Sequence, residues 1–206
     1  TLDPAPFLVS EKYDGVRGHW DGTTLRFRSG RAVAAPGWFT ARLPSVPLDG
    51  ELWLARGRFD ELSGIVRRRV PVDPDWQRVR YMVFDLPGAD GPFAARERRL
   101  REIVAANAWD ALVAVEQSRI AHHGALRRRL AATVAQGGEG LVLHRADAPH
   151  RSGRSDALLK LKPEFDTEAV VVAHHAGRGR LAGQLGALEL RDAAGRRFLV
   201  GSGFFF

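Results

Sequence analysis

The sequence lacks cysteine altogether and contains only three lysines among its 31 basic residues. The absence of cysteine excludes disulfides, zinc sites built on thiolates and cysteine nucleophiles. No apolar run approaches the ~18 residues that a membrane-spanning helix requires, so we expect no membrane partner. Hydrophobic residues nevertheless make up 45% of the chain and charged residues 27%, which is typical of a globular protein with a substantial core.

The three lysines stand out because arginine occupies every other basic position. The guanidinium group of arginine stays protonated and does not act as a nucleophile, whereas an ammonium group loses its proton when its surroundings depress its pKa. Lys12, Lys160 and Lys162 are therefore candidates for chemistry that arginine cannot perform. The alternative is that three solvated lysines have been retained by chance.

The chain has 206 residues, which fits one large domain or two small ones, and it carries a net charge of +7. A basic surface of this kind favours a polyanionic partner such as a nucleic acid, through phosphate contacts and counterion release. Enrichment in arginine from genome composition, with no partner implied, explains the charge equally well.

The apolar patterns predict an α+β protein with a domain boundary near Pro163. The predicted helices cover residues 59–69, 93–108 and 118–135. The predicted strands before the boundary cover residues 7–12, parts of 15–33, 46–54, 79–86, 140–144 and 156–162, and those after it cover 167–174, 185–191 and 197–201.

Lys12 must lose its proton before it attacks as an amine, because an unperturbed lysine titrates near pH ~10.4. Nearby cations and burial both lower the pKa of a lysine, and Arg17 follows Lys12 beyond a turn at Asp14. Lys160 and Lys162 lie two residues apart on a predicted strand, so their side chains point to the same face. Two ammonium groups on one face favour an anion between them, and a polyphosphate is the natural candidate.

Two glutamates occupy positions where a carboxylate is less common. Glu51 lies within an apolar strand, and Glu139 lies between two glycines at the start of another. Each alone is as readily structural as functional, but two acids that converge with lysines are able to hold Mg²⁺ on a phosphate. Phe84 and Trp53 are candidates for stacking on a base, although aromatic residues of strands often belong to the core.

Five short motifs occur in order between residues 11 and 163. They are residues 12–17 (KYDGVR), 48–53 (LDGELW), 81–85 (YMVFD), 139–142 (EGLV) and 159–163 (LKLKP). Together they resemble the signature of the covalent nucleotidyltransferases, which comprise ATP-dependent DNA ligases, RNA ligases and mRNA capping enzymes. Residues 10–22, 36–39 and 62–67 resemble in particular the minimal bacterial ATP-dependent DNA ligases.

The resemblance implies a role for each candidate residue. Lys12 is the catalytic residue that becomes adenylylated, with ATP as substrate and Mg²⁺, or Mn²⁺ in its place, as cofactor. Phe84 stacks on adenine, and Glu51 holds the ribose or assists the metal. The implied nucleotide-binding residues are Glu11, Arg17, Arg28, Glu51, Phe84, Lys160 and Lys162, and the implied metal-binding residues are Glu51 and Glu139.

The resemblance also implies the fold and the reaction. Residues 1–163 form a nucleotidyltransferase domain of antiparallel sheets flanked by helices, and residues 164–206 form an OB-fold domain that is incomplete, with about three of the usual five strands. The expected activity is the sealing of nicks with 5′-phosphate and 3′-hydroxyl ends through a lysine–AMP intermediate. We expect nicked double-stranded DNA as partner, a monomer, and a location in the periplasm, with a leader removed before Thr1, or in the cytoplasm.

Three other interpretations share some of these residues. An RNA ligase or a capping-type enzyme uses the same lysines. The short C-terminal region, which runs to residues 201–206, is compatible with a fragment that undergoes adenylylation and binds DNA without sealing it. A basic nucleic-acid-binding module with a decayed pocket is the non-enzymatic alternative, and the intact Lys12, Glu51 and Glu139 argue against it.

Overall fold

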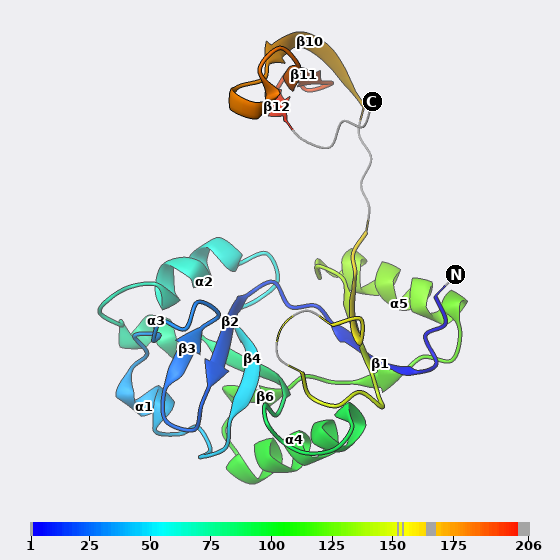
Figure 1. Ribbon diagram of the computed structural model, residues 1–206. Helices are drawn as coiled ribbons and strands as arrows, with labels where there is room; N and C mark the ends of the chain where they lie inside the picture. The colour runs from blue at the N-terminus through cyan, green and yellow to red at the C-terminus, as the bar shows by residue number, and fades with distance from the viewer. Residues whose placement is uncertain (1, 152, 154, 164–167, 202–206) are drawn as a thin grey trace. The chain divides into compact units, whose positions relative to one another are not determined.

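The structure is a computed structural model that describes residues 2–151, 153, 155–163 and 168–201. The chain divides into two compact units, residues 1–163 and residues 164–206, each of which is described by itself (Figure 1). Within the described residues, no helix is long and apolar enough to cross a membrane.

The first unit contains a five-stranded sheet. Its strands, in spatial order, are β3 (Leu25–Phe27), β2 (Val16–Trp20), β4 (Leu48–Trp53), β5 (Arg80–Asp85) and β6 (Leu112–Ala114). All neighbours in this sheet are antiparallel except β5 and β6, which are parallel. The predicted antiparallel pairing is therefore found throughout this sheet except at this edge, where β5 and β6 are joined by the long crossover that parallel neighbours need, supplied by helix α4 (Phe93–Asn107).

Three further helices accompany this sheet: α1 (Gly37–Thr40), α2 (Phe59–Val66) and α3 (Asp73–Trp76). They share one apolar core with the sheet and with α4, built around fully buried residues such as Phe39, Trp76 and Leu100. The ring of Phe39 meets the ring of Trp76 edge to face at 4.9 Å. This core makes the sheet a rigid base for the side chains on its other face.

A second, four-stranded sheet completes the first unit. Its order is β7 (Ser118–Arg119), β1 (Phe7–Glu11), β8 (Leu141–Arg145) and β9 (Leu158–Leu161), and every pairing is antiparallel. Helix α5 (His123–Ala135) packs on it through Leu126, which shares a small core with Val9 and Leu143.

The predicted helix over residues 118–135 is wrong in its first turn. Ser118 and Arg119 instead pair with Val9 and Leu8 as the short strand β7. Helix α5 begins only after His122, whose Nδ1 accepts a hydrogen bond from the backbone of Ala125 at 3.2 Å. The apolar periodicity extends too far because Ile120 is buried in the core from a strand end rather than from a helix.

One buried arginine joins the two sheets. The guanidinium of Arg96, on α4, is fully buried and donates to both carboxylate oxygens of Asp85 at 2.8 and 3.0 Å. The same group donates to the carbonyl of Ala148, beyond β8, at 3.0 Å. These bonds satisfy a charge that would be very costly to bury alone.

The second unit is an antiparallel sheet of β10 (Ala169–Ala176), β11 (Leu185–Asp192) and β12 (Arg197–Val200), with a short 3₁₀ turn η1 (Gly179–Leu181) after β10. The three predicted strands are confirmed here, although residue 167 lies outside the described residues. Residues 202–206 of the predicted C-terminal end also lie outside them. Large apolar side chains of this unit are exposed, among them Val170 and Leu199.

Candidate active site

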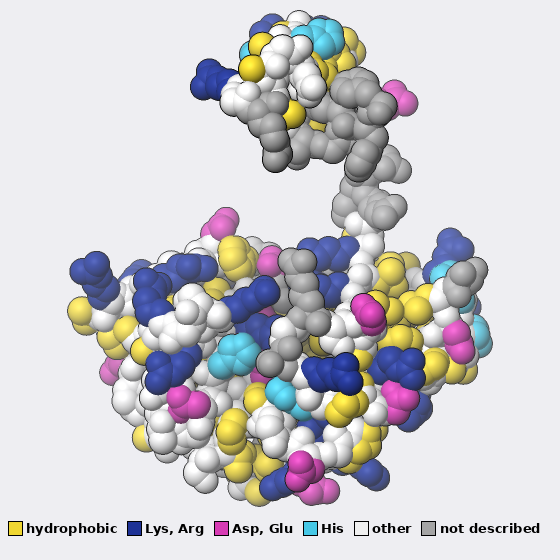
Figure 2. All heavy atoms as spheres, in the orientation of Figure 1, with side chains coloured by type: hydrophobic (Ala, Val, Ile, Leu, Met, Phe, Trp, Pro, Cys, Tyr) yellow, Lys and Arg dark blue, Asp and Glu magenta, His cyan; other side chains and the backbone are white. Residues whose placement is uncertain are grey.

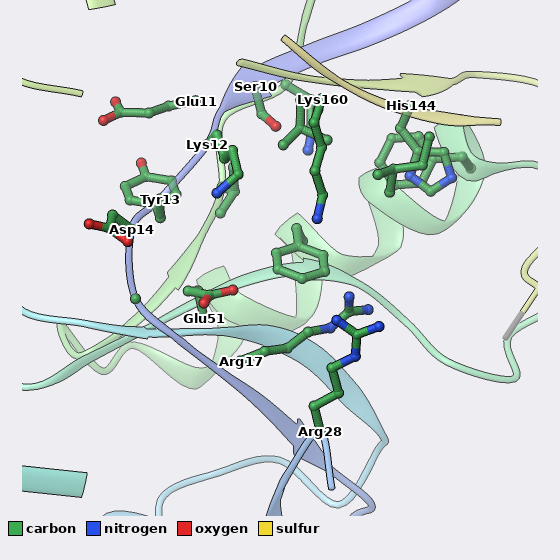
Figure 3. Close-up of a pocket in the computed structure, with 17 residues that line it drawn as sticks. Ser10, Glu11, Lys12, Tyr13, Asp14, Arg17, Arg28, Glu51, His144 and Lys160 are labelled. Carbon is green, nitrogen blue, oxygen red and sulfur yellow. The ribbon is translucent and has the colours of Figure 1, made fainter. Parts of the chain in front are cut away.

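A pocket of the first unit is lined from both sheets (Figure 3). The four-stranded sheet contributes Ser10 and Val142, together with Lys12 just beyond β1. The five-stranded sheet contributes Arg17, Glu51 and Phe84. Residues that are far apart in the sequence therefore converge because the two sheets face each other across this space.

Lys12 follows the last residue of β1, where its backbone N–H donates to the carbonyl of Gly140 at 2.9 Å. Gly140 has φ of 151°, and a Cβ at this position would lie 2.3 Å from the carbonyl oxygen of Leu161. Only glycine allows the chain to pass here, and this close passage brings Glu139 beside Lys12. The Lys12 Nζ forms an ion pair with Glu139 Oε2, and the lysine side chain is only 18% exposed.

Glu139 lies between two ammonium groups, because its other oxygen forms an ion pair with Lys162. Burial acts to raise the pKa of Glu139, but the hydrogen bonds from Lys12 and Lys162 outweigh it and hold the pKa below the usual value. The same pairing raises the pKa of Lys162. The expectation that cations surround Lys12 is therefore wrong at closest range, where its partner is a carboxylate.

Lys160 and Lys162 occupy different places. Lys160 lies on β9, opposite Val142 of β8, and its ammonium group points into the pocket (Figure 3). Lys162 follows the end of β9, is 53% exposed and is absent from the lining of the pocket. Of the two lysines expected to face one ligand, Lys160 lines the pocket, whereas Lys162 contacts the site through Glu139.

Arg17 and Arg28 both line the pocket, and their guanidinium groups point to the same end of it (Figure 3). Arg17 donates through Nε to Oδ1 of the buried Asp49 at 3.0 Å and through Nη2 to the other oxygen. Its guanidinium lies 5.5 Å from the ring centre of Phe84, which also lines the pocket. Asp49 thereby fixes one of the two arginines beside an aromatic wall.

Glu51 is held at the pocket by a close contact between β4 and the chain before β2. A Cβ on Gly15 would lie 2.3 Å from the carbonyl oxygen of Leu52 and 2.7 Å from Cγ of Glu51. Glycine is therefore required in this motif. Burial raises the pKa of Glu51 to about 7, although the charges of Arg17 and Lys12 oppose the shift.

The carboxylate of Glu11 has a partner of its own. It accepts hydrogen bonds from Nε and Nη2 of Arg56 at 2.8 and 2.7 Å. Figure 3 shows its carboxylate pointing away from Lys160. Glu11 lines the pocket, as expected of a nucleotide-binding position, but its negative charge is already paired with Arg56.

The sequence reasoning missed three residues around this site: Asp49, Arg56 and His144. His144 lines the pocket, stacks on Phe93 with ring centres 3.7 Å apart, and has its pKa lowered to about 4 by burial. Asp49 adjoins Gly50 inside the second motif, so its motif position was the available signal. Nothing in the sequence singled out Arg56 among 28 arginines.

The acids of the site suit a magnesium ion that is also bound by a substrate. Within the described residues, no group of three or more His, Cys, Asp or Glu side chains could hold a metal by itself. Mg²⁺ in nucleotide sites usually takes only one or two carboxylates, with waters and phosphates completing its shell. Glu51 and Glu139 fit that requirement, and they are near enough for the charge of Glu139 to affect the pKa of Glu51.

Comparison with known proteins identifies the family. A family model described as "ATP dependent DNA ligase domain" matches residues 1–162, which is most of the chain. The chain belongs to the ATP-dependent DNA ligase family. The five motifs of the sequence therefore lie in a ligase, as their order predicted.

Two curated relatives illustrate how much of a ligase this chain spans. A DNA ligase of Haemophilus influenzae is 34% identical over 198 residues, covering 96% of this chain and 73% of that protein. A probable DNA ligase of Streptomyces avermitilis is 32% identical over 95% of this chain but only 43% of its own length.

Solved structures agree with this assignment. A structure from a structure–function study of Lig E DNA ligases has a TM-score of 0.89 and 41% identity, and the match covers 99% of this ligase and 80% of that chain. A Chlorella virus DNA ligase–adenylate has a TM-score of 0.67 at 20% identity, over 97% of this ligase and 79% of that chain, and so supports the fold alone. The predicted fold class, an α+β adenylation domain followed by a small antiparallel sheet of the OB-fold region, is confirmed.

Proposed function

We propose that this ligase begins its reaction when the neutral amine of Lys12 attacks the α-phosphate of ATP. An N–P bond forms, the amine loses one proton to solvent, the bond between the α-phosphorus and the bridging oxygen breaks, and pyrophosphate leaves with the electron pair. The observation that carries the proposal is the convergence of Lys12, Lys160 and Glu51 on one pocket from two sheets. Arginine at position 12 could not perform this step because its guanidinium stays protonated.

Other side chains of the pocket have the chemistry that a bound nucleotide requires. Phe84 offers an apolar wall for the adenine ring. Lys160 and Arg28 line the pocket without a hydrogen bond or ion pair to the side chains that the structure describes. They are therefore ready to contact phosphate oxygens, where charge develops during the transfer.

Glu51 and Glu139 would hold Mg²⁺ together with the phosphates of ATP. The ion, when bound, would neutralise charge on the phosphoryl oxygens during the transfer. Replacement of the Lys12–Glu139 contact by metal and nucleotide would also release the amine that Glu139 now pairs. Mn²⁺ has similar ligand preferences and would serve in place of Mg²⁺.

The remaining steps act on nicked double-stranded DNA. The 5′-phosphate of the nick would take AMP from Lys12, and the 3′-hydroxyl would then displace AMP and join the strand. The net charge of +7 and the many Lys and Arg side chains on the face shown in Figure 2 support binding to a polyanion. We also propose that the ligase acts as a monomer, in the periplasm or the cytoplasm.

The decisive test is the intact mass of the protein after incubation with ATP and Mg²⁺. We expect a gain of one AMP in the native protein and none in Lys12→Arg, with the melting temperature of the variant confirming that it folds. An adduct on Lys12→Arg would remove Lys12 from this role. Parallel incubations with GTP, and then with nicked RNA in place of nicked DNA, separate this activity from those of capping enzymes and RNA ligases.

A further inference from the structure

Arg56, which the motifs do not include, donates four hydrogen bonds beside the pocket. It follows β4 of the five-stranded sheet, and its guanidinium holds both carboxylate oxygens of Glu11, at the end of β1 in the four-stranded sheet. Through Nη1 the same guanidinium donates to the backbone carbonyl and the side-chain oxygen of Gln136, at 3.2 and 3.1 Å. One side chain thus ties together both sheets and the end of helix α5.

The segment that Arg56 secures leads directly to Glu139. Gln136 is the C-cap of α5, and Gly137 follows it with φ of 81°. A Cβ on Gly138 would lie 3.0 Å from Oε1 of Glu11, so the segment passes close to the carboxylate that Arg56 holds. The hydrogen bond from Lys12 N–H to the Gly140 carbonyl then closes this loop against the nucleophile.

We propose that Arg56 is a positioning residue, which holds Glu11 and the 136–140 segment so that Lys12 and Glu139 are aligned for attack on the nucleotide. This inference rests on the proposed role of Lys12. Arg56 does not line the pocket and touches neither Lys12 nor the place where ATP would bind, so it acts through Glu11 and Gln136.

Positioning is separated from stability by comparing the rate of each variant with its melting temperature. The side chain of Arg56 is 33% exposed and that of Glu11 is 17% exposed, and the two form a bidentate pair. Such a pair also stabilises the fold, so a lower melting temperature alone does not support a positioning role. Small displacements of a reacting group, in contrast, reduce a transfer rate strongly, because the reaction depends on the alignment of the attacking atom.

The test uses single-turnover formation of the AMP adduct by the whole chain, followed by intact mass at a series of ATP concentrations. For Arg56→Gln we expect the rate at saturating ATP to fall roughly 10- to 100-fold, with the half-saturating ATP concentration changed by less than about threefold. Arg56→Lys keeps the charge but not the fork that binds both oxygens, so it should remain within about threefold of the Gln variant. It also serves as the second variant if Arg56→Gln does not fold.

Arg58→Gln is the matched control. Arg58 is a neighbouring, more exposed arginine that also pairs with an acid, Glu61, at 3.4 Å. Its rate should stay within about twofold of the native protein, because exposed pairs hold no reacting group in place. The proposal is overturned if Arg56→Gln keeps its rate, if Arg56→Lys restores it, or if Arg58→Gln loses as much.

Hydrogen exchange supplies a measurement that does not depend on catalysis. The amides of Gly137 and Gly138 donate to Val134 and Thr133 at 2.8 and 2.9 Å, and we expect their exchange to accelerate at least tenfold in Arg56→Gln, with α4 unchanged. Unchanged exchange would overturn the positioning role even if no adduct forms. Absence of an adduct in the native protein would instead contradict the role of Lys12, so the two failures are distinguishable.

Discussion

The two ends of the pocket differ in how their cations are neutralised. At the end that holds the nucleophile, the ammonium groups of Lys12 and Lys162 share the carboxylate of Glu139, and Glu11 is bound by Arg56. At the other end, Arg28 has no ion pair among the described side chains, although Arg17 beside it is paired with Asp49, and Lys160, which points into the pocket, also has none. The pocket therefore offers unsatisfied positive charge to an incoming polyphosphate at one end and a neutralised nucleophile at the other.

This difference between the two ends suits an enzyme whose nucleophile reacts only after its substrate has bound. A free cationic cluster attracts ATP and lowers the energy of its phosphates. Glu139 occupies the ammonium group of Lys12 until this pairing is exchanged for contacts with the nucleotide and its metal. The difference between the ends predicts that removing Glu139 affects the rate, whereas removing Lys160 affects the binding of ATP.

Glu139→Gln tests the end of the pocket that holds Lys12, and it should have the largest effect on the rate of adduct formation. It preserves the size of the side chain but leaves two ammonium groups without their shared counter-charge and removes a proposed metal ligand. We expect the rate of adduct formation at saturating ATP and Mg²⁺ to fall by roughly 100-fold, because positioning and charge neutralisation dominate phosphoryl transfer. Single-turnover mass measurements check this.

The control for that variant is Glu102→Gln, which removes an exposed acid of helix α4 and should leave the rate unchanged. A faster reaction in Glu139→Gln would reverse the interpretation, since it would mean that Glu139 mainly restrains Lys12. The mutual repulsion of Lys12 and Lys162 would then be what activates the amine.

Lys160→Gln tests a cation of the pocket that has no ion pair among the described side chains. Its expected effect, on the binding of ATP, is smaller. Charge-assisted hydrogen bonds to a phosphate contribute about 1.5–3 kcal/mol each, so the half-saturating ATP concentration should rise by roughly 10-fold or more. Lys162→Gln is the matched comparison because Lys162 contacts Glu139 rather than the pocket. If the two variants weaken ATP binding equally, the distinction between the two ends is wrong.

Much of this fold was predictable because its local patterns are strong. The helical spacing of Leu100, Ile103 and Val104 predicts α4, which ends within one residue of the predicted position. The short strands β6 and β7 were missed because two or three residues carry no periodicity of their own. Both strands exist only through pairing with a distant strand, as Ser118 does with Val9.

The candidate site was also predictable only in part. Lys12, Glu51, Phe84 and other residues that the motifs name line one pocket, whereas Glu139 and Lys162 are absent from its lining, and the individual roles of all these residues remain predictions. The partners of those residues were not predictable, because the pairs are remote in the chain. Lys12 and Glu139 are 127 positions apart, and Glu11 and Arg56 are 45 apart. Which acid meets which cation depends on how the two sheets face each other, which no local pattern reports.

Glu51→Gln tests the half-buried acid of the pocket through the stability of the fold, where the expected effect is small. Burial raises the pKa of Glu51 to about 7, above the ~4.3 of an unfolded glutamate. The folded state thus binds this proton more tightly, so the stabilisation is complete below pH ~4 and is lost as the pH rises through 7. A glutamine never ionises, so the melting temperature of Glu51→Gln should exceed that of the native protein by roughly 2–6 °C at pH 8. The gain should shrink as the pH falls and vanish near pH ~4. Exposed Glu116→Gln should show no such dependence, and an equal gain at both pH values would mean that the charge of Glu51 carries no cost in the fold.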